Sequence, residues 1–135
     1  MKTLLLVGRL IFGAWMVVNG LNHFFVHLYP EPTGHELLAV QLMTAFVHSK
    51  LIDVAMVMQL VAGALILTGF FVPVALCVLM PVSTCAVYWT VVLEHSAAGA
   101  VLALAAFALN GLLMLAYIDY YRGVLQRSAS ALGEA

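Results

Sequence analysis

The chain has 135 residues, of which 65% are hydrophobic and 8% are charged, and its net charge is -1 with neutral histidines. A soluble domain carries about 25% charged residues, so this composition excludes an ordinary soluble fold and predicts an integral membrane protein. The near-zero net charge also argues against a nucleic-acid partner.

Apolar runs long enough to cross a bilayer occupy most of the chain. A helix that rises about 1.5 Å per residue needs about 20 apolar residues to cross a hydrocarbon core about 30 Å thick. Four runs meet this length, at residues 4–25, 51–71, 72–93 and 97–117. We predict an all-α fold, a four-transmembrane-helix bundle, as a single domain over residues 1–127. Residues 128–135 form a short tail whose small and polar composition favours disorder.

The first run begins like a cleavable secretion signal, because Lys2 precedes an apolar segment. However, Arg9 interrupts the apolar region, no small-x-small cleavage site follows, and the run is long enough to span. We therefore assign it as the first span. Two structural interpretations of Arg9 remain open. Its side chain either snorkels to the interface or pairs with Asp119 at the same end of the fourth span.

The connection between the first two runs contains a further helix. After the Pro30-Glu31-Pro32 breaker, residues 34–49 have a helical pattern with one apolar side and one narrow polar stripe. The apolar side carries Leu38, Leu42, Ala45 and Phe46, and the stripe carries Gln41, Thr44 and His48. About 16 residues are too few to span, so we expect an additional short interfacial or re-entrant helix.

Polar side chains gather at one end of the predicted bundle. Asn19, His23 and His27 recur at i, i+4 and i+8 on the first helix. Asp53, near the start of the second span, lies at a comparable depth, as do Glu94 and His95 at the turn between the third and fourth spans. The candidate cofactor-binding residues are His23, His27, Asp53 and His95. Three interpretations stay open: structural pairing at a hydrated rim, a small-molecule or quinone head-group site, and a metal or haem site. The spacing of a dedicated zinc motif is not present, so no metal ligands are assigned.

The remaining polar residues within the spans are expected to be structural. Gln59 and Asn110 lie nearer the midplane, where an amide side chain usually hydrogen-bonds another helix. Cys77 and Cys85 are about 12 Å apart along one helix, which is too far for a disulfide. The structural intramembrane polar residues are Arg9, Asn19, Gln59, Asn110 and Asp119. The residues expected in interfacial aromatic belts are Tyr88, Trp89, Tyr117, Tyr120 and Tyr121.

The distribution of basic residues predicts the topology. Four spans place both termini on one side, and that side carries Lys2, Arg9, Arg122 and Arg127, whereas the other side carries Lys50. By the positive-inside rule both termini are cytoplasmic. In a bacterium the chain would be a multi-pass protein of the inner membrane, with the histidine-bearing rim facing the periplasm.

Several local patterns resemble the DoxX family of small four-helix bacterial membrane proteins. The similarity covers residues 4–121, and its motifs are built mainly of glycine and apolar residues. The matching stretches are Gly8-Arg9 with Phe12-Gly13, Asn19-Gly20-Leu21-Asn22-His23-Phe24, Gln59-Leu60-Val61-Ala62-Gly63-Ala64-Leu65, Thr68-Gly69-Phe70 and Val72-Pro73-Val74-Ala75. Many family members carry a glutamate where this chain has Gln59, so a proton or ion role tied to that carboxylate does not carry over.

The resemblance implies association with redox complexes, because such proteins occur as small membrane subunits linked to thiosulfate and quinone chemistry or to oxidative stress. It supplies no catalytic residue set. Our first hypothesis is a non-catalytic small subunit that packs in or stabilises a larger respiratory, photosynthetic or redox assembly. Its partners would be the lipid bilayer and other membrane subunits or further copies of the chain.

Two alternatives belong to other classes of function. One is a quinone- or electron-transfer-linked membrane subunit with a cofactor or head-group site at the periplasmic rim; the sequence requires no cofactor, and quinone or haem would be the candidates. The other is a small transporter or lipid-handling protein, for which the features in favour are Asn110 and the mid-span Pro81.

Overall fold

The computed structural model describes residues 1–28 and 33–124 of the chain. The predicted tail at 128–135 and the Pro30-Glu31-Pro32 breaker lie outside these residues. The elements follow in the order α1 (Lys2–Leu21), η1 (Asn22–Val26), α2 (Leu37–His48), α3 (Leu51–Thr68), α4 (Val72–Tyr88), η2 (Trp89–Leu93), α5 (Ala97–Ala116) and α6 (Ile118–Tyr121).

Four helical stretches are long and apolar enough to cross a membrane: Lys2–Val26, Leu51–Thr68, Val72–Leu93 and Ala97–Ala116. The predicted all-α fold with four long apolar helices is therefore confirmed, as is the shorter helix between the first two. The second span ends at Thr68 and not at residue 71, because Gly69 adopts a φ of 84° that terminates the helix. The sequence did not predict η1 and η2, the five-residue π-helical segments that end the first and third spans.

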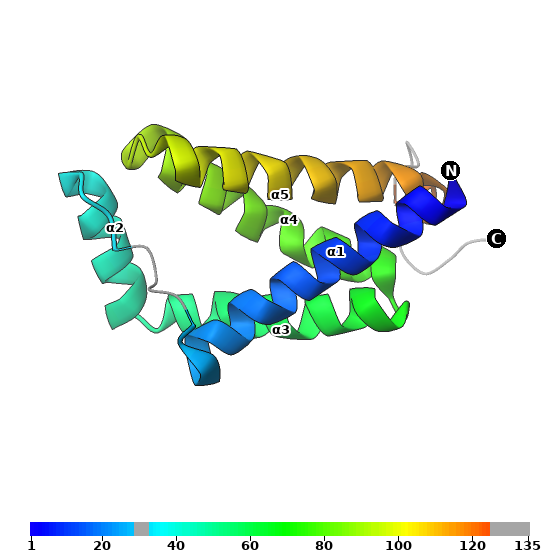
Figure 1. Cartoon of the computed structure of the whole chain (residues 1–135), viewed down its shortest axis with the longest axis horizontal. Helices are drawn as coiled ribbons and strands as arrows, with labels where there is room; N and C mark the ends of the chain where they lie inside the picture. The colour runs from blue at the N-terminus through cyan, green and yellow to red at the C-terminus, as the bar shows by residue number, and fades with distance from the viewer. Residues whose placement is uncertain (29–32, 125–135) are drawn as a thin grey trace, which may run out of the picture.

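The four long helices lie side by side and leave both described chain ends at the same end of the bundle (Figure 1). We call this the terminal end, and the opposite end, where α2 lies, the α2 end. α1 packs mainly along α3, and α4 packs against both α3 and α5. The short connection at residues 69–71 makes α3 and α4 antiparallel neighbours.

Glycine allows α1 and α3 to approach each other closely. A Cβ on Gly13 would lie 3.1 Å from the Gly63 carbonyl oxygen, and a Cβ on Gly63 would lie 2.9 Å from the Gly13 carbonyl oxygen. A Cβ on Gly20 would lie 2.9 Å from Leu60 Cβ. Because lipid tails are as apolar as core side chains, such close backbone packing is a main source of helix association in membranes. We call this contact the α1–α3 seam.

The core lies between the long helices, towards the terminal half of the bundle. Its largest fully buried side chains are Phe12, Ile66, Leu76, Leu79, Leu113 and Asn110. Most of the long-helix surface remains uncovered, since between 17% and 28% of each span's most apolar window is buried inside the molecule. The uncovered apolar surface is what a lipid-facing bundle requires.

Helix α2 crosses the α2 end and turns one narrow face towards the bundle. Ala39 is fully buried, and Leu42, Met43 and Phe46 are half-buried, so the inward face follows i, i+3, i+4 and i+7 spacing. Leu38, which the sequence pattern placed on the apolar side, is 62% exposed. The predicted polar stripe is exposed along its length: Gln41, Thr44 and His48.

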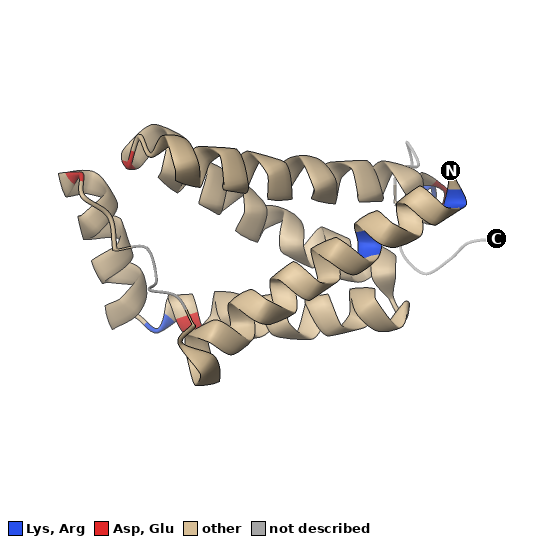
Figure 2. Ribbon diagram, viewed as in Figure 1, with Lys and Arg blue, Asp and Glu red and all other residues tan. Residues whose placement is uncertain are grey.

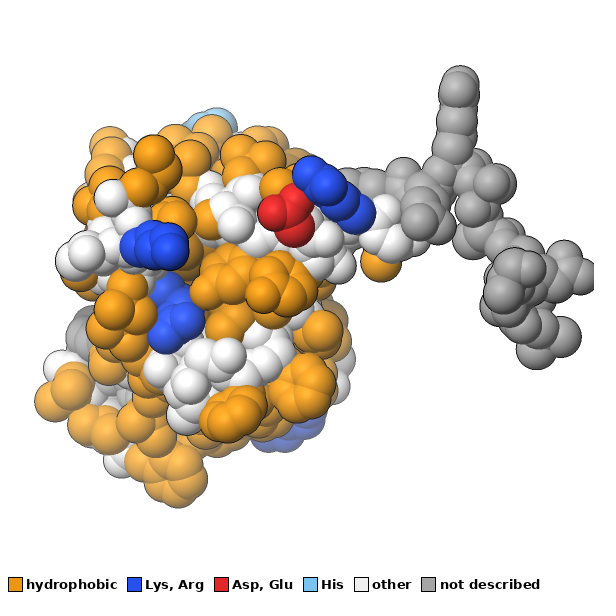
Figure 3. All heavy atoms as spheres, turned by 90° about the vertical axis from the view of Figure 1, so that its right-hand side faces the viewer, with side chains coloured by type: hydrophobic (Ala, Val, Ile, Leu, Met, Phe, Trp, Pro, Cys, Tyr) orange, Lys and Arg blue, Asp and Glu red, His pale blue; other side chains and the backbone are white. Residues whose placement is uncertain are grey.

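Along the ribbon, the charged residues lie towards the two ends of the bundle, and its middle carries none among the described residues (Figure 2). Seen from the terminal end, several basic side chains gather among hydrophobic ones, and an acidic side chain lies beside one of them (Figure 3). This distribution is the one expected of a chain whose middle lies in hydrocarbon, where a buried charge costs at least about 2.5 kcal/mol.

Candidate functional site

His23 and Asp53 form the closest polar pair among the predicted site residues. His23 lies in η1 and Asp53 in the first turn of α3, and His23 Nε2 is 2.8 Å from Asp53 Oδ1. The His23 side chain is 13% exposed and the Asp53 side chain 38%. The α1–α3 seam brings the two together, because Gly20 one turn earlier packs against Leu60. Asp53 also lies at the positive end of the α3 dipole, which favours a carboxylate there.

The His23–Asp53 pair could exchange a proton or bind a polar group. A carboxylate bonded to one imidazole nitrogen fixes the orientation and tautomer of the ring, and the ring can then exchange a proton or bind a polar group. Lys50 Nζ is 4.0 Å from Asp53 Oδ2, so a cation also lies beside the carboxylate. Asn22, in the same π-helical segment as His23, is buried at 2% exposure, and Asn19 is half-buried on α1.

The other two predicted histidines lie at helix ends and are exposed. His27 follows η1 with a φ of 49°, and His95 lies between η2 and α5 with a φ of 54°. The start of α3 and the α4–α5 connection lie at opposite edges of the α2 end, with α2 running between them (Figure 1). The structure therefore brings His23 and Asp53 together and places His95 apart from them. Within residues 1–28 and 33–124, no three His, Cys, Asp or Glu side chains form a group suited to a metal ion.

Glu94 forms a second polar site, at the beginning of α2. The backbone N–H of His35 donates to both Glu94 carboxylate oxygens, at 2.9 and 2.8 Å, and the N–H of Glu36 donates to Oε2 at 3.2 Å. His35 Nδ1 lies 2.8 Å from Oε1. Free N–H groups and a positive dipole end mark the start of every helix, so Glu94 acts as a cap supplied from the α4–α5 connection.

The hydrogen bonds also affect the titration of Glu94. The backbone N–H of His35, and after it the His35 ring, hold the pKa of Glu94 below its ordinary value of 4.5. The side chain is 6% exposed, although its bonding partner, the His35 side chain, is 94% exposed. Glu94 therefore stays ionised while it is bonded to the start of α2.

Trp89 makes the second attachment of α2. Its indole Nε1–H donates to the Ala39 carbonyl oxygen at 3.1 Å in a buried position. Trp89 is 8% exposed, so the prediction that it belongs to an interfacial aromatic belt is wrong. Gly34, with a φ of 83°, lets the preceding chain approach, because a Cβ there would lie 3.2 Å from both Glu94 Oε2 and Trp89 Cζ2. We call the Glu94 and Trp89 contacts the α2 latch.

At the terminal end, Arg9 and Asp119 have separate partners. Arg9 Nη1 donates to the Tyr117 hydroxyl at 3.4 Å, and its guanidinium lies beside Gly69, at the carbonyl end of α3. Asp119 instead pairs with Arg122 at 2.9 Å on the surface. Of the two interpretations of Arg9, the ion pair with Asp119 is therefore wrong for the described residues. A cation near a helix C-terminus is favourable, which accounts for the observed position.

Polar groups in the middle of the bundle join helices. Asn110, on α5, is fully buried, and its Nδ2 donates to Ser83 Oγ on α4 at 3.4 Å. The predicted interhelical hydrogen bond of Asn110 is thereby confirmed. Gln59 is 9% exposed on α3. Cys77 and Cys85 are free and exposed, in agreement with the predicted absence of a disulfide between them.

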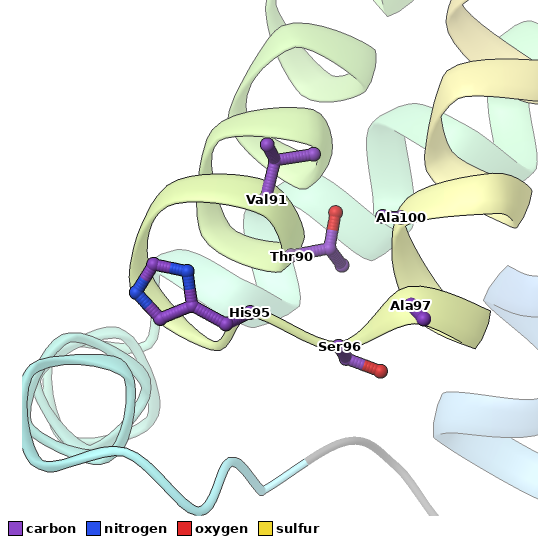
Figure 4. A pocket seen from close by; sticks show the side chains of 6 residues that line it. All are labelled: Thr90, Val91, His95, Ser96, Ala97 and Ala100. Atoms are coloured by element: carbon purple, nitrogen blue, oxygen red, sulfur yellow. The ribbon is translucent and has the colours of Figure 1, made fainter.

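Two surface hollows occur near the α2 end. One is a shallow depression beside the α4–α5 connection, where His95 and Ser96 lie close to Thr90 and Ala100 (Figure 4). The other is an apolar groove between α2 and α4. The depression has short side chains as its walls, and His95 is its titratable residue.

The fold and the polar contacts define a class of protein, a small multi-pass membrane bundle with a short helix latched across one end. The DoxX family model matches residues 4–95, from the start of α1 to the residue after Glu94. The chain therefore belongs to the DoxX family. Neither a curated protein nor a solved structure matches it.

Proposed function

We propose that this DoxX protein is a non-catalytic small subunit that packs in and stabilises a larger membrane assembly. The observation that carries the proposal is the uncovered outer face of α5. A Cβ on Gly111 would meet no heavy atom within 4 Å, and Ala108, one turn earlier, is exposed, as are the neighbouring Leu104, Leu112 and Leu115. Small residues on a membrane helix let a second helix approach closely.

The hydrogen bonds that polar side chains make within the bundle support the same proposal. Glu94 caps α2, Asn110 joins α5 to α4, and Arg9 bonds to Tyr117, so each holds the bundle together. These groups have structural partners within the chain. The accessible surface that remains is mainly apolar, which suits contact with lipid and with partner helices.

Extraction from native membranes in mild detergent tests this proposal. We expect Ala108→Leu and Gly111→Leu to reduce recovery of co-purifying subunits at least tenfold, because a large side chain separates the helix faces. Ala14→Leu, on an exposed position of α1, is the matched control and should leave recovery unchanged. Size measurement of the purified complex distinguishes a second copy of the chain from a different subunit. A partner-free monomer from wild-type membranes contradicts the proposal.

A second function is favoured by the partly buried His23–Asp53 pair, which suits a head group with hydrogen-bonding oxygens, such as a quinone. An imidazole held by a carboxylate 2.8 Å away can donate to a carbonyl oxygen. His27 and His95 complete the candidate set as exposed residues at the same end of the bundle.

Binding of a short-chain quinone to the protein in nanodiscs tests this second function. We expect His23→Ala and Asp53→Asn to weaken binding at least tenfold, and His27→Ala and His95→Ala to weaken it less. His48→Ala is the control, because the His48 ring bonds to the Thr44 carbonyl oxygen of its own helix. Equal quinone affinity in all five variants would contradict a quinone site at this end of the bundle. An absorption spectrum and elemental analysis of the same preparation test for haem and metal.

We also propose that both termini face the cytoplasm of a bacterial inner membrane. Lys2, Arg9 and Arg122 lie towards the terminal end, and Lys50 lies at the α2 end. The excess of basic residues at the terminal end supports this orientation.

A further inference from the structure

The groove between α2 and α4 has a volume of about 290 Å³ and is lined by side chains of both helices. Leu42 and Phe46 of α2 form one wall, and Thr84, Cys85 and Tyr88 of α4 form the other. Its walls come from elements that are far apart in the sequence. The groove therefore exists only because α2 is held against the bundle.

Water is a poor occupant of this groove. A buried water needs two to four polar partners, and the walls are mainly aliphatic and aromatic. The Thr84 hydroxyl is already engaged, because it donates to the Met80 carbonyl oxygen of its own helix at 2.8 Å. An empty groove would also leave the wall atoms without dispersion contacts. The walls thus favour an apolar occupant.

The position of the groove along the membrane-spanning helix indicates which apolar molecules can reach it. Thr84 lies 12 residues after Val72, the first residue of α4, and so about 18 Å along the span at 1.5 Å per residue. The hydrocarbon core is about 30 Å thick, so this position is within it. Cys85 is exposed and Tyr88 is 54% exposed, and the exposed surface of α4 continues into η2 at Val91, at 40% exposure. The groove is therefore continuous with the surface that contacts lipid.

The α2 latch keeps the wall of the groove in place. Trp89 bonds to Ala39, one turn before Leu42, and Glu94 caps the start of the same helix. Because these bonds hold α2 against the bundle, the groove should retain an apolar chain for longer than an open lipid-facing surface does. We propose that the groove between α2 and α4 is a binding site for one acyl chain of a membrane phospholipid.

Photocrosslinking of the full chain in nanodiscs tests this proposal. The probe is a phosphatidylethanolamine that carries a diazirine in the middle of one acyl chain. We expect adducts on residues 42–46 and 84–88 to exceed those on Leu104 and Leu112, exposed side chains of α5, at least fivefold, as mapped by mass spectrometry. Unlabelled phosphatidylethanolamine should compete for the groove adducts.

A large side chain that fills the groove should abolish the preferential labelling of the groove residues by the probe. We expect Cys85→Trp to reduce groove adducts at least fivefold, and Leu42→Trp to do the same from the opposite wall if the first variant does not fold. Cys77→Trp is the matched control, because Cys77 is exposed on the same helix but does not line the groove. Adducts spread evenly over the lipid-facing surface would overturn the proposal. So would displacement of the probe by a long-chain quinone but not by phospholipid, which would assign the groove to an isoprenoid tail.

Discussion

The α1–α3 seam and the α2 latch hold their helices by opposite means. In the seam, backbones approach until a Cβ on Gly63 would lie 2.9 Å from the Gly13 carbonyl oxygen, and the contact involves no charge. In the latch, a carboxylate accepts from the two backbone N–H groups just before α2 and an indole donates to a carbonyl of α2, at distances of 2.8 to 3.2 Å. The seam depends on shape, whereas the latch depends on hydrogen bonds.

The difference follows from where each contact lies. Inside hydrocarbon there is no hydrophobic driving force between helices, so close packing is needed for association. At the end of the bundle a short helix needs polar partners for its free N–H groups. A latch made of a few hydrogen bonds opens at a lower free energy than a packed seam, so α2 should be the part of the bundle that opens first.

The largest expected effect comes from breaking the seam. Gly63→Leu forces a side chain against the Gly13 backbone and Met16, and overpacking of this kind costs about 3 kcal/mol. We expect the midpoint of unfolding, followed by circular dichroism in detergent, to fall sharply. Gly111→Ala is the control, because its Cβ meets nothing within 4 Å, and it should be neutral or stabilising by up to about 1 kcal/mol. Equal midpoints for the two variants would contradict the importance of the seam.

A smaller and local effect is expected when the indole bond of the latch is removed. Trp89→Phe removes the indole donor, whereas the Ala39 carbonyl keeps the bond from the Met43 N–H of its own helix, so the cost is that of one hydrogen bond, about 0.5 to 1.5 kcal/mol. Amide hydrogen exchange should accelerate in residues 37–48 and stay unchanged in α1 and α3. Trp15→Phe, at a half-buried position of α1, should not accelerate α2. Faster exchange throughout the bundle would show that the α2 latch and the α1–α3 seam open together as one cooperative unit.

The Glu94 bond makes the latch sensitive to pH. The folded pKa of Glu94 is lowered, so its contribution is fully present above the unfolded value of about 4.5 and is lost as the pH falls through the lowered folded pKa. The groups that face it are His35 and Glu36 of the α2 start, with His95 adjacent in the chain. In a Trp15→Phe background, Trp89 fluorescence should change over this acidic range and remain constant at higher pH.

Glu94→Gln provides the control for the pH prediction. It keeps an oxygen that can accept from the His35 N–H but removes the charge, so the acidic transition in fluorescence should disappear. A transition that persists unchanged in this variant would assign the pH dependence to another group.

The smallest effect is expected from the surface ion pair at the terminal end. Asp119 and Arg122 are 2.9 Å apart, but their side chains are 73% and 78% exposed. Exposed pairs contribute about 0 to 1 kcal/mol, so Asp119→Asn should shift the unfolding midpoint by little or nothing. A large loss would contradict the account of this pair as a weakly contributing surface contact.

The four spans could be predicted from the sequence because span length and hydropathy are local properties. The end of the second span was placed at residue 71 because the apolar run continues to there, whereas the φ of 84° at Gly69 ends α3 at Thr68. The partners of polar residues could not be predicted in this way. Glu94 and His35 are 59 residues apart, and only the packed bundle shows that the α4–α5 connection meets the start of α2.

The candidate site was predicted in part for the same reason. The i, i+4 spacing placed His23 on the rim, and the depth of Asp53 placed it at the same end of the bundle, but the contact between the two is shown only by the structure. His95 shares that depth, but depth does not fix position around the bundle: the α4–α5 connection that carries His95 lies at the opposite edge of the α2 end from the start of α3 (Figure 1). Trp89 was interpreted as an interfacial residue because no local signal distinguishes a belt tryptophan from one that anchors a second helix.

Compartment mapping tests the central claim that the chain crosses the membrane four times with the α2 end and the termini on opposite faces. In a background of Cys77→Ala and Cys85→Ala, Ser96→Cys reports on the α2 end and Lys2→Cys on the terminal end. We predict that an impermeant maleimide added to intact cells labels the first variant, and labels the second only after the membrane is broken. Equal labelling of both variants in intact cells would contradict the account.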